Sequence, residues 1–167
     1  MKIKDILNLT DGTLTNTPQV QAIAAATVFP SKVEHGDLFF SSIQEDIDKA
    51  IEKGAYAIVY DNKEIIKKDD EIAWIEVSDI KLAAFKLIRY VTLKKEAEFF
   101  LLEPHEMSFL KMVLTHKGNV AFIDNAWRKV FEQILNSDDR LFVGTDKELL
   151  GLIKPDIKKL KEDVEGY

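Results

Sequence analysis

The chain of 167 residues contains no cysteine, so disulfide bonds and thiolate metal sites are excluded, and the absence fits a reducing cytosol. No stretch approaches the roughly 18 consecutive apolar residues that a membrane-spanning helix requires. The N-terminal sequence MKIKDILNLTDG is too polar for a signal peptide. These absences predict a cytoplasmic protein that has no membrane partner.

An excess of positive charge is also lacking, because the net charge is −6. Phosphate backbones bind to concentrated positive charge, so we expect no nucleic-acid partner. The one lysine-rich segment, residues 154–161, contains Asp156 and runs into further acidic residues, which is typical of a solvated helix face. With 46% apolar and 31% charged residues, the chain has the composition of one globular domain or two small ones.

Residues 36–61, GDLFFSSIQEDIDKAIEKGAYAIVYD, are typical of a strand, a helix and a second strand. Ser42 and Glu45 have the spacing of a capping box, in which each side chain satisfies a free backbone N–H at the helix start. Gly54 follows the helix, where a left-handed residue is least costly in glycine. One helical face is expected to hold Ile43, Ile47, Ala50 and Ile51. The unit predicts a parallel strand pair with a right-handed crossover.

The rest of the first half fits around this unit. Residues 1–8 favour a short helix, and residues 20–29 are apolar but ambiguous between strand and helix. Residues 72–77 alternate as a strand, and Ser78 is a suitable N-cap for the helix that follows.

The charged stretch KKEAE, residues 94–98, marks the expected boundary between a domain over 1–93 and a smaller one over 94–167. Strand and helix patterns alternate again beyond it, and residues 107–114 are apolar nearly all round, which predicts a buried helix. Helix caps are expected at Asp124 or Asn125, and at Thr145 with Glu148. The predicted fold class is α/β, with a doubly wound, mostly parallel sheet or two small ones. Further patterns place strands at 99–102, 120–123 and 141–143, a turn at Lys117-Gly118 and a weak helix over 155–167.

Familiar catalytic and metal-binding patterns are missing. The three histidines, His35, His105 and His116, are far apart and none has the helical spacing of a metal site. Adjacent carboxylates such as Asp69-Asp70 occur in expected loops, where they are typical of solvated turns. We therefore expect no metal, no cofactor and no catalytic residue.

A triphosphate-binding loop, G-x-x-x-x-G-K-[ST], is also missing, although glycine-rich backbone is what wraps N–H groups around phosphates. The strand and helix order would allow such a loop only at residues 101–109, LLEPHEMSF. This segment has no glycine or lysine, and it places Glu103 and Glu106 where phosphate would bind. These carboxylates are expected to repel a polyphosphate.

Ligands of doubly wound sheets bind at the carboxyl ends of the strands. The polar residues at these positions are candidate ligand-binding residues, and the same pattern is more typical of turn and cap residues that hold no ligand. Gly144-Thr145 offers, in addition, a helix start for a single anion. The candidates are Thr27, Ser31, Lys32, Ser41 and Ser42 in the first half, and Asp124, Asn125 and Thr145 in the second.

The first half resembles the N-terminal, uridine-nucleotide-recognising domain of the Mur ligases, the ATP-dependent enzymes that extend the peptidoglycan precursor. That family carries D-S-R-x-V-x-x-G-D-x-F, then a D-G-H-x-F loop, then A-I-x-x-G-A-x-A-x-V, then V-x-D. The matching segments here are Val33 with Gly36-Asp37-Leu38-Phe39, residues 50–59 (AIEKGAYAIV), and Val77-Ser78-Asp79. The resemblance implies a Mur-ligase N-terminal-like domain followed by a Rossmann-like unit.

Departures from the family pattern concern its functional motifs. The D-S-R positions hold Phe29, Pro30 and Ser31, and the D-G-H-x-F loop is shortened away. Residues 98–114 occupy the place of the family's strand, phosphate loop and helix, without T-G-x-x-G-K-T. Ligation through an acyl-phosphate needs a triphosphate grip, a magnesium site and a lysine. The chain resembles a truncated ligase without these parts.

The function expected from this resemblance is that of a non-catalytic pseudoenzyme, a binding or interaction protein near peptidoglycan-precursor synthesis. Its partner would be a cell-wall synthesis protein or a UDP-sugar-peptide precursor. Two alternatives stay open: a small-ligand or uridine-nucleotide-precursor binder, and a subunit of a split UDP-MurNAc-peptide ligase. The pattern leaves the oligomeric state open.

Overall fold

A computed structural model describes residues 1–114 and 120–157. The chain divides into two compact units, Met1–Leu87 and Ile88–Tyr167, and each is described by itself. The division falls inside one helix, α3 (Ile80–Lys95). The domain boundary expected at 93/94 lies near the end of the same helix and stays a prediction.

The first unit is built on a sheet of five strands in the order β1-β5-β4-β3-β2. Strands β2 to β5 are parallel, and β1 pairs antiparallel with β5. The ambiguous segment 20–29 contributes the short edge strand β2. In chain order the elements before α3 are α1 (Ile3–Thr10), β1 (Thr13–Leu14), β2 (Ala26–Thr27), the 3-10 turn η1 (Pro30–Lys32), β3 (Leu38–Phe40), α2 (Gln44–Glu52), β4 (Ala57–Tyr60) and β5 (Ala73–Glu76).

The strand–helix–strand unit predicted over residues 36–61 is confirmed as β3, α2 and β4, with Phe39 opposite Ile58 in a parallel register. Gly54 takes a φ of +95°, as expected for the residue that ends the helix. The predicted capping box is wrong. The N-cap is Ile43, whose N–H donates to Ser41 Oγ over 3.1 Å. Glu45 lies beyond reach of the cap and pairs with Lys49 instead.

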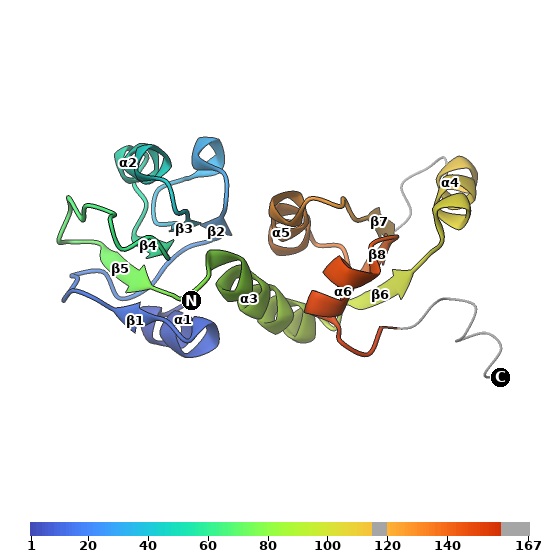
Figure 1. Cartoon of the computed structure of the whole chain (residues 1–167), viewed down its shortest axis with the longest axis horizontal. Helices are drawn as coiled ribbons and strands as arrows, with labels where there is room; N and C mark the ends of the chain where they lie inside the picture. Colours follow the sequence, from blue (N-terminus) through green and yellow to red (C-terminus); the bar gives the residue numbers. More distant parts are fainter. Residues whose placement is uncertain (115–119, 158–167) are drawn as a thin grey trace. The chain divides into compact units, whose positions relative to one another are not determined.

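Side chains on both faces of the first sheet are buried, because helices cover both faces. α2 packs Ile47 and Ala50 against a cluster that includes Phe39 and Trp74. α1 and the first turns of α3 lie on the opposite face (Figure 1). Burial of each large apolar side chain stabilises the fold by roughly 1.5–3 kcal/mol.

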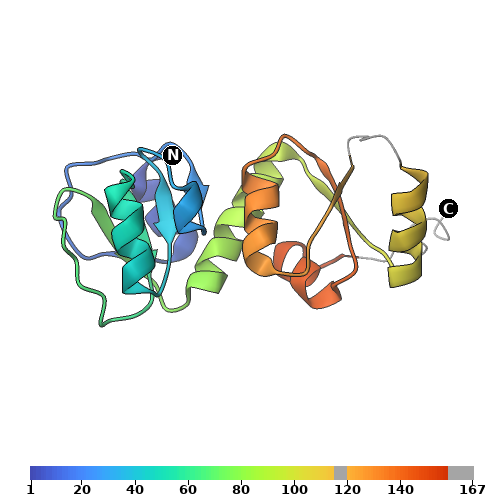
Figure 2. The ribbon, with the colours of Figure 1, turned by 90° about the horizontal axis from the view of Figure 1, so that it is seen from above.

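The second unit continues α3 and adds a sheet of three parallel strands in the order β6-β8-β7. The strands therefore form two separate sheets. α4 lies on one face of this sheet, and α5 lies on the other (Figure 2). No described helix is long and apolar enough to cross a membrane. The elements are β6 (Glu98–Leu101), α4 (Pro104–Val113), β7 (Val120–Phe122), α5 (Trp127–Leu135), β8 (Leu141–Gly144) and α6 (Lys147–Ile153).

The expectation that α4 is buried all round is wrong. Met107 is its one buried residue and packs with Leu102 and Val143. Phe109 is 68% exposed and Met112 is 75% exposed. A sheet of three strands offers the helix a single surface, so only one side of α4 is covered. The turn expected at Lys117-Gly118 and most of the helix expected over 155–167 lie outside the described residues.

Candidate functional site

Thr27, Ser41 and Ser42 lie at the carboxyl edge of the first sheet, where doubly wound folds place ligands. Thr27 Oγ1 accepts a hydrogen bond from the Phe29 N–H over 3.2 Å. Ser41 Oγ accepts from the Ile43 N–H in the same way, and both side chains are buried. These hydroxyl groups therefore close the turns that follow β2 and β3.

Ser31 and Lys32 lie in η1, away from these residues. The Lys53 Nζ donates to the Ser31 carbonyl over 2.7 Å, which ties η1 to the C-terminal end of α2. Ser42 precedes the N-terminal end of the same helix. A helix of this length spans roughly 13 Å, so the structure separates Ser31 from the carboxyl edge.

Asp61 and Asn62 are polar residues of this edge that the sequence reasoning did not select. Asn62 Nδ2 donates to the Ser42 carbonyl over 3.3 Å, and Asn62 Oδ1 accepts from the Glu64 N–H. Asp61 Oδ2 accepts from the Ile80 N–H at the start of α3. Their position directly after an apolar strand is the sequence signal that could have identified them as residues of this edge. Both side chains tie loops of the edge together.

Gln44 fixes the loop between β4 and β5 to the start of α2. Its Oε1 accepts from the Ile66 N–H over 2.7 Å, and its Nε2 donates to the Ile66 carbonyl over 3.2 Å. Lys68, two residues further, pairs with Asp48 of α2 over 2.8 Å. This pairing and a hydrogen bond from Gln44 lower the pKa of Asp48. The loop is therefore held in a defined place.

Three large apolar side chains are exposed after neighbouring parallel strands at this edge. Ile43 follows β3 and is 55% exposed, Ile66 follows β4 and is 63% exposed, and Leu82 follows β5 and is 50% exposed. We call them the carboxyl-edge surface. Ile43 was expected on the buried face of α2, but it precedes the first helical turn and points outward. Of these residues, Ile43 and Ile66 are linked through Gln44, which follows Ile43 and hydrogen-bonds to the Ile66 backbone. Exposed apolar side chains are typical of interaction sites where they form a patch.

The carboxyl edge of the second sheet has a different character. Glu103 and Glu106 form a capping box at the start of α4, in which the Glu103 N–H donates to Glu106 Oε2 over 3.0 Å. The side chain of Glu103 in turn accepts from the backbone of Glu106. The chain's own carboxylates thus occupy N–H groups at the helix N-terminus that would otherwise attract an anion.

The candidates of the second unit lie in turns before α5 and α6 and cap neither helix. The cap expected at Asp124 or Asn125 is wrong, because Ala126 is the N-cap of α5. Asp124 Oδ1 accepts from the Ala126 N–H over 2.8 Å, and this bond, with nearby Lys129, lowers the pKa of Asp124. Asn125 is exposed, and Thr145 is half-buried. The expected cap of Thr145 with Glu148 is wrong, because α6 begins one residue later. Asp146 is the N-cap and accepts from the Leu149 N–H.

The histidines make no metal site in the part of the chain that the structure describes. His35 Nε2 lies 3.0 Å from the Tyr56 hydroxyl at the amino edge of the first sheet. His105 is exposed in the first turn of α4, and His116 lies outside the described residues. Within residues 1–114 and 120–157, no three histidine or carboxylate side chains are grouped to hold a metal ion.

Comparison with known proteins gives matches among solved structures alone: no family model matches the chain, and no curated protein does. A structure of MurF from Acinetobacter baumannii matches with a TM-score of 0.63 at 15% identity, over 86% of this chain and 35% of that chain. The UDP-N-acetylmuramoylalanyl-D-glutamyl-2,6-diaminopimelate–D-alanyl-D-alanyl ligase of the same organism gives 0.61 at 15% identity, with the same coverage.

The MurF ligase from Thermotoga maritima, solved in complex with ADP, matches with a TM-score of 0.61 at 19% identity, over 78% of this chain and 35% of that chain. This chain therefore spans about a third of the length of the ligases that it matches. Identities this low establish the fold alone. The resemblance noted in the sequence is confirmed at that level: the chain has a Mur-ligase-like fold.

Proposed function

We propose that this chain is a non-catalytic, Mur-ligase-like interaction protein that binds a protein partner in peptidoglycan-precursor synthesis. The link to that synthesis rests on the fold shared with MurF. The observation that carries the interaction role is the carboxyl-edge surface, Ile43, Ile66 and Leu82, at the edge where this fold class binds its ligands.

The polar groups of that edge support a protein partner over a polar small ligand. Ser41, Asp61 and Asn62 each make hydrogen bonds within the chain. Three of the side chains that stand out into solvent at this edge, Ile43, Ile66 and Leu82, are apolar. An apolar surface gains most by burial against another apolar surface, which is how the cores of protein interfaces are built.

The start of α4 supports a role without ATP-dependent chemistry. Glu103 and Glu106 close the N-terminus of this helix with two negative charges. A phosphate placed there would lose the helix N–H groups and meet like charges. Phosphoryl transfer depends on the opposite arrangement, with cations and free N–H donors around the phosphates.

The first test concerns catalysis. The purified chain is incubated with ATP, magnesium and UDP-muramoyl-peptide precursors, and phosphate release is measured. We expect no release above the rate without protein, and robust turnover would overturn the proposal. Thermal shifts with uridine nucleotides provide the second arm, because a ligand of the native state raises the melting temperature. A clear shift would favour a nucleotide-precursor binder.

The second test concerns the surface. Tagged chain is used to capture partners from native cytosol, and the capture is repeated with the double variant Ile43→Ser, Ile66→Ser. Serine suits the N-cap position of residue 43, so this variant is expected to keep its fold. The control is Met112→Ser, which removes an even more exposed apolar side chain elsewhere.

We expect a cell-wall synthesis protein to be captured by the native chain and the control, and lost with the double variant. If the double variant still captured the partner, the carboxyl-edge surface would not be the binding surface, and this part of the proposal would be overturned. A captured complex with ligase activity would instead identify the chain as a subunit of a split ligase.

A further inference from the structure

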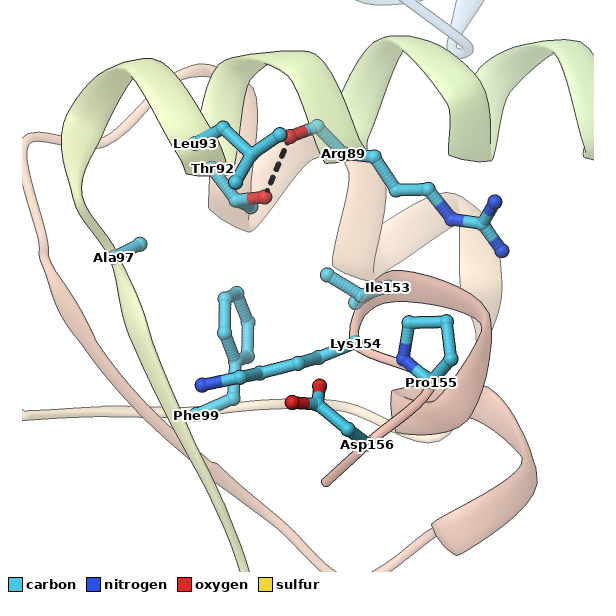
Figure 3. A pocket seen from close by; sticks show the side chains of 9 residues that line it. All are labelled: Arg89, Thr92, Leu93, Ala97, Phe99, Ile153, Lys154, Pro155 and Asp156. Carbon is cyan, nitrogen blue, oxygen red and sulfur yellow. Dashed lines mark hydrogen bonds between the residues drawn. The ribbon is translucent and has the colours of Figure 1, made fainter.

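The second unit contains a hollow of about 410 Å³ at the amino end of β6, away from the capped start of α4. The C-terminal turns of α3 form one wall, and the turn after α6 forms the other (Figure 3). Its volume falls within the range of roughly 300–1,000 Å³ that is typical of small-molecule sites. The candidate residues and the carboxyl-edge surface take no part in it.

The apolar part of the hollow consists of well-packed side chains. Phe99 and Ile153 line it and are almost fully buried. The ring of Phe99 stacks on Phe142, with centroids 5.0 Å apart and an interplanar angle of 13°. This stacking gives the hollow an apolar surface that suits a flat or aliphatic group.

Hydrogen bonds within the second unit hold the walls in place. Arg89 Nε of α3 donates to the Leu152 carbonyl of α6, which ties the two walls together. Thr92 Oγ1 donates to the Arg89 carbonyl over 2.8 Å, as Figure 3 shows. The Ala97 N–H donates to the Thr92 carbonyl over 2.9 Å and fixes the turn before β6. A site that needs little ordering loses little affinity on binding.

Three charged side chains line the hollow: Arg89, Lys154 and Asp156. None of them has an ion-pair partner among the described residues. Two cations and one carboxylate leave one net positive charge, on a chain whose net charge is −6. A single negative charge on the ligand balances this set, whereas a phosphate dianion would add repulsion from Asp156.

We propose that this hollow binds a small monocarboxylate with an apolar body of about the size of a phenyl ring. The apolar body rests on Phe99 and Ile153, and the carboxylate faces Lys154, whose ammonium lies on the opposite side of the hollow from the Arg89 guanidinium (Figure 3). This site is separate from the proposed partner surface, so either proposal can fail without the other.

The test is an NMR titration of the ¹⁵N-labelled full chain with 3-phenylpropionate as the probe. We expect saturable shift changes at the backbone amides of Thr92, Phe99 and Ile153, with a Kd below about 10 mM. The neutral isostere 3-phenylpropanamide is expected to bind several-fold more weakly, because it lacks the charge. Equal binding of the amide, absence of saturation, or shifts centred on Ile66 or Phe109 would overturn the proposal.

Two variants locate the site. Lys154→Gln is expected to weaken binding of 3-phenylpropionate about fivefold, because a charge-assisted contact is lost. The matched control, Lys147→Gln, removes an exposed lysine at the other end of α6 and is expected to leave binding unchanged. Ala97→Phe fills the hollow and should abolish binding, with the remaining amide spectrum reporting an intact fold. Unchanged binding in both pocket variants would also overturn the proposal.

Discussion

Glu106 accepts a hydrogen bond from the backbone N–H of Glu103 over 3.0 Å, and Glu103 caps the same helix in return. The N-terminus of α4 is therefore satisfied from within the chain. Glu103 and Glu106 therefore have two effects. They stabilise the start of α4, and they place negative charge at the position where a nucleotide-binding fold would bind phosphate.

Replacement of Glu106 by alanine is expected to lower the free energy of unfolding by about 1 kcal/mol, because the Glu103 N–H loses its acceptor. Urea denaturation measures the change. Glu106→Gln keeps an acceptor oxygen and should lose less than the alanine variant. Equal stability of the native chain and Glu106→Ala would show that the capping box contributes nothing.

Substitution of Gly54 tests how much stability depends on a glycine at the left-handed position that ends α2. An alanine there would keep a φ of +95° and place its Cβ 2.7 Å from His35 Nδ1. The left-handed conformation alone costs an L-residue roughly 1–2 kcal/mol, so we expect Gly54→Ala to lose at least that much stability. Thermal or urea unfolding gives the value.

The control for this variant is Gly151→Ala within α6, where an added Cβ meets nothing within 4 Å. Alanine favours a helix over glycine by roughly 0.8–1.0 kcal/mol, so this change should stabilise the chain. A Gly54→Ala chain that proved as stable as Gly151→Ala would contradict the conformational argument.

Substitution of Lys95 tests how much its side chain stabilises the C-terminal end of α5. Its Nζ donates to the carbonyls of Ile134 and Ser137, near the C-terminus of that helix. Lys95→Met removes both bonds from partly buried carbonyls, and we expect a loss of about 2 kcal/mol at neutral pH. Lys94→Met is the control, because Lys94 is exposed in the same helical turn. Equal losses from the two variants would count against a specific role for Lys95.

The pH dependence of the same variant follows from burial, which lowers the pKa of Lys95 below its ordinary value of 10.5. Between the folded pKa and 10.5, the unfolded chain binds the proton more strongly than the folded chain. Stability from Lys95 therefore rises with pH in that window. Urea titrations should show the deficit of Lys95→Met growing as the pH approaches 10.5, and a shrinking deficit would contradict the assigned direction.

Asp124 also contributes stability that rises with pH, but in the acidic range and through its charged form. Its pKa is lowered, first by the hydrogen bond from the Ala126 N–H and then by Lys129, so its charged form stabilises the folded chain above the ordinary pKa of 3.8. That stability is lost as the pH falls through the folded pKa. Asp124→Asn is expected to cost a fraction of a kcal/mol at pH 6, because the side chain is largely solvated.

The cost of Asp124→Asn should disappear in strongly acidic solution, where Asp124 itself is protonated. Urea unfolding of the two chains across the acidic range measures this convergence. A constant difference at all pH values would assign the effect to the amide group and not to the charge.

Helix caps show where sequence reasoning fell short by one residue. Ser42 with Glu45 and Thr145 with Glu148 have the spacing of a cap, yet α2 begins after Ile43 and Asp146 caps α6. Several neighbouring residues at each helix start can cap, so local pattern does not choose among them. The choice depends on where the preceding strand ends in the sheet.

The sequence by itself determined most of the order of strands and helices, the parallel pair around α2 and the left-handed glycine at its end. Each of these depends on neighbouring residues: apolar periodicity, turn residues and the freedom of glycine. The negative charge at the start of α4 was also readable, because Glu103 and Glu106 lie in one short segment.

Only the tertiary structure decided what residues distant in sequence do together. It separated Ser31 from Ser42, joined Gln44 to Ile66, and exposed the outer side of an apolar helix, α4. It also brought Arg89, Phe99 and Lys154 around one hollow. The physical reason is that burial and long-range hydrogen bonds depend on how many strands a sheet has and where each loop packs, which local propensity does not encode.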